Sequence, residues 1–140
     1  MNPRHATGRI ASLFVSLALS ACFPLDGPEH RLDEQYYLWA ADISEQMALY
    51  RQLPENGGIE RVGQTVFAAG ADRRHVIAQR HPQGDRTRTE YFILERAKDA
   101  PLADSKTSVR GPFTKEEFEQ ARVRLGVAPT LSFSVVLERL

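Results

Sequence analysis

Few residues of this 140-residue chain have the types and spacing that chemistry requires. Its one cysteine, Cys22, excludes an intrachain disulfide and any zinc site built from several cysteines. His75 and His81 lie six residues apart, about 20 Å along a strand, so they do not share a metal ion. The chain contains no Gly-Xaa-Ser-Xaa-Gly elbow, P-loop or His-Glu-Xaa-Xaa-His motif. We therefore expect no enzymatic activity, no cofactor and no metal.

An apolar run precedes Cys22 and predicts export. It extends over twelve residues, Ile10 to Ala21, and follows the basic residues Arg4 and Arg9. A bilayer-spanning helix takes about 20 residues, so this run is too short to cross a membrane. Its length and its basic flank are those of a signal peptide.

The end of this run resembles the lipobox of bacterial lipoproteins. Leu19, Ser20 and Ala21 are followed directly by Cys22. The resemblance implies cleavage before Cys22, a diacylated thiol and an acylated new amine, with palmitate-like chains that anchor the protein in a membrane. Phe23, in place of an aspartate, implies the outer membrane, with the domain facing the periplasm.

The chain therefore divides into a signal peptide at residues 1–21, a lipid-anchored tether at 22–34 and one domain at 35–140. Basic and acidic residues number 18 each, which excludes a nucleic-acid binder driven by bulk charge. A hydrophobic content of 42% is enough for a folded core.

Patterning in the domain predicts an α+β fold, with a mostly antiparallel sheet of about five or six strands. Alternating or aromatic-rich runs indicate strands at 35–41, 64–69, 74–81, 87–96 and 131–137. The apolar residues of 42–53 fit both the helical spacing and the alternating spacing of a strand, and we favour a strand over a helix. Residues 97–111 are polar and show no periodicity. Thr114 and Glu117 form a capping box for one helix that ends at Gly126.

The main surface feature is a group of basic side chains between residues 73 and 88. We take it as a candidate binding patch for an anionic partner, against the alternative of a solvated strand edge. The patch consists of Arg73, Arg74, Arg80, His81, Arg86 and Arg88.

Several short strings resemble a family of small bacterial lipoproteins of unknown function. They are Tyr37-Leu38-Trp39 with Asp42, Val66 to Gly70, His75 to Ala78, His81-Pro82 and Tyr91 to Leu94. The resemblance covers roughly residues 36–137. The resemblance implies a compact sheet domain, and it implies no particular activity.

We thus expect a non-catalytic envelope domain whose partners are the membrane, through the lipid on Cys22, and a protein. One alternative is an immunity or inhibitor lipoprotein that blocks a toxic periplasmic enzyme. A further alternative is an enzyme acting on envelope polymers, in which Asp42 or Glu90 works with His81.

Overall fold

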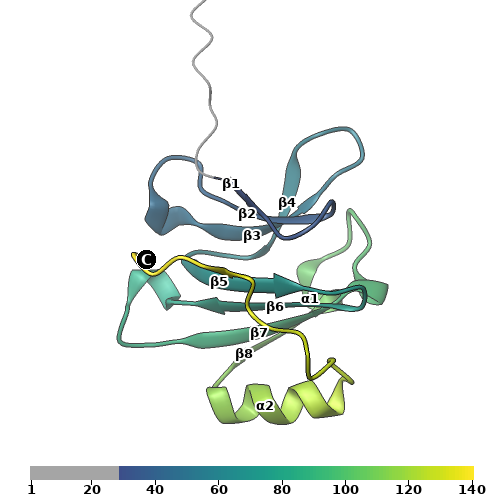
Figure 1. The fold of residues 1–140 in the computed structure, drawn as a ribbon. Helices are drawn as coiled ribbons and strands as arrows, with labels where there is room; N and C mark the ends of the chain where they lie inside the picture. The colour runs from purple at the N-terminus through teal and green to yellow at the C-terminus, as the bar shows by residue number, and fades with distance from the viewer. Residues whose placement is uncertain (1–28) are drawn as a thin grey trace, which may run out of the picture.

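The computed structural model describes residues 29–140, which form two antiparallel sheets and a helical layer (Figure 1). The expected lipobox, the expected signal peptide and most of the expected tether lie outside these residues. The first sheet has the order β1 (Glu29–Arg31), β2 (Tyr36–Trp39), β3 (Ala48–Gln52) and β4 (Gly58–Val62). The second has the order β8 (Val109–Phe113), β7 (Glu90–Glu95), β6 (His75–Arg80), β5 (Val66–Ala71) and β9 (Val135–Val136).

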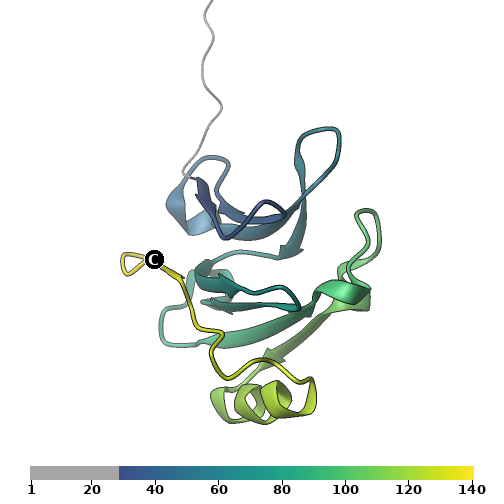
Figure 2. The same ribbon diagram turned by 45° about the vertical axis from the view of Figure 1, so that its right-hand side comes forward.

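The second sheet forms the middle layer, between the first sheet and helix α2 (Lys115–Arg124) (Figure 2). Strand side chains alternate between faces, so β6 and β7 supply two cores at once. Val76 and Leu94 pack toward the first sheet, while Ile77 and Ile93 pack toward α2. This double burial explains why residues 91–94 are apolar without a break.

The predicted α+β class is confirmed, as are the strands expected near 35–41, 74–81 and 87–96. Helix α2 begins with the predicted capping box: the Glu117 amide donates to Thr114 Oγ1 at 3.2 Å, and the Thr114 amide donates to the Glu117 carboxylate at 2.8 Å. Residues 42–53 contain a short 3₁₀ turn, Ser44–Gln46, before β3, so the strand that we favoured occupies their second half.

Three parts of the fold differ from the expectation. Strand β1 pairs with β2 inside the segment assigned to the tether, so the folded domain begins by Glu29 rather than at residue 35. Strand β4 was not expected as a separate element. Residues 97–111, expected to be irregular, contain the short helix α1 (Ser105–Ser108) and the start of β8.

The C-terminal segment crosses the second sheet very close to β5. Strand β9 covers only Val135 and Val136, a much shorter strand than the one expected at 131–137, and the next residue, Leu137, donates its N–H to the main-chain oxygen of Phe67 in β5. At Gly70 a Cβ atom would lie 1.9 Å from the main-chain oxygen of Ser132. Gly70 therefore lets the two backbones approach and sets where this segment lies.

We predict that Gly70→Ala destabilises the domain by about 1–3 kcal/mol, the usual cost of overpacking, because the new Cβ meets main chain rather than a movable side chain. The fluorescence of Trp39, the single tryptophan, reports urea unfolding. Gly63→Ala is the matched control, since its Cβ would meet the flexible Glu60 carboxylate at 3.2 Å. Equal unfolding midpoints for the two variants would contradict the assigned role of Gly70.

Candidate functional site

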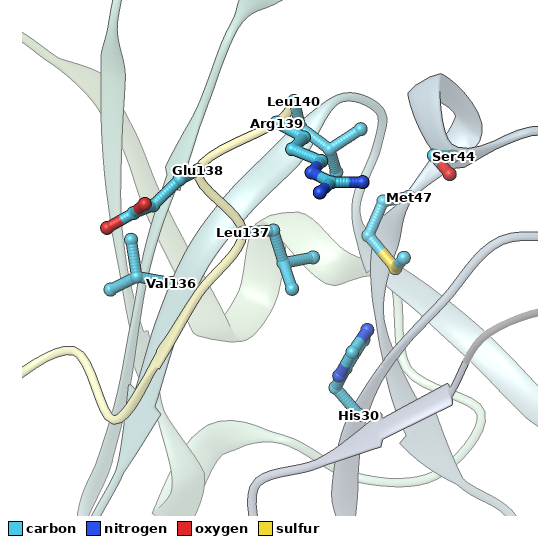
Figure 3. A pocket seen from close by; sticks show the side chains of 8 residues that line it. All are labelled: His30, Ser44, Met47, Val136, Leu137, Glu138, Arg139 and Leu140. Carbon is cyan, nitrogen blue, oxygen red and sulfur yellow. The ribbon is translucent and has the colours of Figure 1, made fainter.

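A hollow of about 390 Å³ opens between β1 and the C-terminal segment (Figure 3). Met47 and Leu137 form its apolar centre, and the ring of His30 points into the space between them. Arg139 lies at one end of the hollow, near Ser44, with its guanidinium directed across the opening. Protein sites for small molecules are mostly apolar and carry a few polar groups, which is the composition found here.

A second hollow, of about 300 Å³, shares Arg139 and Leu140 with the first. His81 and Arg86 line it, together with Glu45. Arg86 donates a hydrogen bond to the main-chain oxygen of Arg139, so it lies directly beside the C-terminal segment. The two hollows thus place an apolar space next to a cluster of basic side chains.

The structure divides the predicted basic patch into two groups. Arg73 and Arg74 precede β6, whereas the other members lie at its far end or in the loop beyond it. Six strand residues span about 20 Å, so the two groups do not meet on one ligand. At the far end, Arg80 and Arg88 both pair with Glu90, at 2.8 and 3.7 Å.

His81 is held at the start of the loop that follows β6. Its ring stacks on Phe67, with centroids 4.1 Å apart. Its Nδ1 lies 2.7 Å from the main-chain oxygen of Arg88, and this oxygen can only accept, so Nδ1 is the donor. The ring therefore has Nε2 left for a ligand.

The structure gives no support to an acid–base pair with His81. Glu90 is engaged by the two arginines, and Asp42 is exposed in the turn before β3. Among residues 29–140, no group of three histidines or acids is placed to hold a metal ion. The aromatic side chains of β2 divide between the two faces of the strand: Tyr36 is fully buried, while Tyr37 stacks on Tyr50 on the opposite face.

Sequence reasoning missed a buried charged cluster centred on Asp99. Arg61 Nε forms an ion pair with Asp99 Oδ1 at 2.8 Å, and this oxygen accepts a hydrogen bond from Ser108 Oγ at 2.9 Å. Tyr36 Oη donates to Oδ2 at 2.6 Å, and Arg51 Nη1 lies 3.2 Å from the same oxygen. The Asp99 side chain has no exposed surface.

These contacts make the Asp99 cluster structural rather than catalytic. Both carboxylate oxygens are occupied by protein donors, so a substrate would find no free lone pair that solvent can reach. Burial, and then the hydrogen bond to Asp99, raises the pKa of Tyr36, which keeps its phenol protonated as a donor. The Arg61 guanidinium also donates to the main-chain oxygens of Ala100 and Ala103 and thereby holds this loop.

A family model described as "Protein of unknown function (DUF3997)" matches residues 33–137 of the chain. The match spans nearly the whole described domain and confirms the expected membership of a family of unknown function. No curated protein and no solved structure matches the chain.

We predict that Asp99→Asn destabilises the domain by about 3–5 kcal/mol, because it leaves the buried cation Arg61 and the partly buried cation Arg51 without their anion. Urea unfolding followed by Trp39 fluorescence measures the change. Glu119→Gln, which alters an exposed carboxylate of α2, is the control and should cost less than about 0.5 kcal/mol. A loss below about 1 kcal/mol in Asp99→Asn would show that the cluster does not hold the sheets together.

We predict that stability falls as the pH drops below about 6.5 and that His75 contributes to this loss. Burial lowers the pKa of folded His75, although Asp72 and Glu95 oppose the shift. Below the unfolded value of about 6.5 the unfolded state takes up the proton first, so unfolding becomes easier. His75→Gln should reduce the fall in unfolding free energy between pH 7 and pH 5, and it should leave the pH 7–8 dependence unchanged. An identical fall in the variant would exclude His75 as a source.

Proposed function

We propose that this chain, which belongs to the DUF3997 family of proteins of unknown function, is a lipoprotein of the cell envelope whose domain acts by binding. The observation that carries the proposal is the sequence Leu19-Ser20-Ala21-Cys22 at the end of a twelve-residue apolar run. The lipid on Cys22 holds the domain at the outer membrane, on its periplasmic side.

The distance between Cys22 and the fold supports this arrangement. Glu29, at the start of β1, is seven positions after Cys22, so the two residues are at most about 25 Å apart. No helix within residues 29–140 is long and apolar enough to cross a bilayer. We assign membrane attachment to the lipid on Cys22.

The side chains of the domain support binding rather than catalysis. The buried carboxylate of Asp99 is fully engaged by protein donors, and Glu90 is paired with two arginines. The accessible features are the apolar hollow and the basic side chains beside it. A membrane-held domain with these features is suited to capturing a ligand or a protein at the membrane surface.

We predict that a clickable palmitate precursor labels the wild-type chain and that Cys22→Ala abolishes the label, because the thiol is the acceptor. The labelled protein should fractionate with the outer membrane, while the variant should keep its signal peptide and migrate more slowly on a gel. Phe23→Ala, which leaves the thiol in place, is the control and should keep the label. Equal labelling of wild type and Cys22→Ala would overturn the anchor assignment.

A further inference from the structure

We propose that the hollow between β1 and the C-terminal segment binds a fatty acid, with the hydrocarbon chain against Met47 and Leu137 and the carboxylate against Arg139. This inference rests on the proposed function, because it assigns a ligand class to a domain that the anchor keeps beside a membrane. It adds a binding site that is separate from the lipid attached to Cys22.

The apolar walls account for the hydrocarbon chain. Met47 is 1% exposed and belongs to the core between the sheets, and Leu137 packs against the same core. The floor of the hollow is therefore apolar, and a hydrocarbon group that lies on it gives up no hydrogen bonds to water. Its volume of about 390 Å³ lies in the range of small-molecule sites, about 300–1,000 Å³.

The basic side chains account for the carboxylate. Within residues 29–140, neither Arg139 nor Arg86 makes an ion pair, in contrast to Arg80 and Arg88. Glu138 also lines the hollow, but its carboxylate lies near Val136, away from His30 and Met47 (Figure 3). An anion at the end of the hollow would thus meet a free guanidinium, and charge-assisted hydrogen bonds of this kind are about twice as strong as neutral ones.

The proposed anchor on Cys22 favours a ligand that comes from membrane lipid, because it keeps the hollow close to the bilayer. His30, which points into the hollow, lies eight residues after Cys22, a reach of at most about 29 Å. The opening is consequently held near the bilayer, where single-chain acids are released from lipids. A protein partner would need a broader face, so a peptide in the hollow is the competing outcome.

Met47 provides a direct probe, because the chain has only two methionines and Met1 belongs to the signal peptide. We would record the resonances of isotope-labelled methionine methyl groups in the lipidated chain, reconstituted in lipid nanodiscs, during titration with decanoate. The expected result is a saturable shift of the Met47 methyl resonance. Trp39 lies on the opposite face of the first sheet from Leu38, so its indole resonance should stay in place.

Two comparisons test the carboxylate assignment. Arg139→Gln should weaken decanoate binding about tenfold, the loss expected for one charge-assisted hydrogen bond, and should not affect decanol. Arg124→Gln removes an equally exposed arginine from the end of α2 and should bind decanoate like the wild type. Both residues are on the surface, so neither change is expected to impair folding.

The outcomes separate this inference from the proposed function. A missing or non-saturable shift of Met47, or displacement of decanoate only by a peptide, overturns the fatty-acid site. Equal affinity for decanol and decanoate, with no effect of Arg139→Gln, overturns the carboxylate assignment. A second methionine methyl resonance, from Met1, would show that the signal peptide is retained; it would contradict the proposed function and leave the Met47 titration readable.

Discussion

The carboxylate of Asp99 joins the two sheets, and the position of most other elements depends on it. Arg51 and Arg61 reach it from β3 and β4 of the first sheet, while Asp99 itself follows β7 of the second. A buried carboxylate without partners would cost several kcal/mol, so the ion pairs and the loop around Asp99 must form together. The Arg61 guanidinium then fixes the main chain of this loop, and helix α1 is held beside β4.

The Asp99 cluster holds the two sheets together at one edge. At the opposite edge, fewer and weaker contacts join them. Sheet order places β4 at the edge that the Asp99 cluster covers and β1 at the opposite edge. At the β1 side, the second sheet ends in β9, which pairs over two residues only. Leu137 and Leu140 pack against the core there and are themselves only partly buried. The hollow therefore lies at the β1 edge, where the sheets are less tightly joined than at the β4 edge. Gly70 determines how closely the C-terminal segment approaches β5 there.

Local signals in the sequence were sufficient for the elements that local chemistry forms. The Thr114–Glu117 capping box acts across three residues, and the apolar run at 91–94 reflects burial on both faces of one strand. The Asp99 cluster could not be found in this way, because Tyr36 and Asp99 are 63 positions apart and neither lies in a recognisable motif. The basic patch was misjudged in extent for a related reason: sequence proximity ignores the length of β6, which separates Arg74 from Arg80.

The division of the basic residues also limits what the domain can recognise. A broad positive face would suit a polyanion, but Arg80 and Arg88 share one acidic partner, Glu90, and Arg73 and Arg74 lie at the other end of β6. Within residues 29–140, Arg86 and Arg139 make no ion pair, and they flank the C-terminal segment where it borders the apolar hollow. Surface charge alone attracts any anion and is screened by salt. Charge beside an opening onto the core selects an anion that also carries an apolar chain, because only such a ligand gains from both.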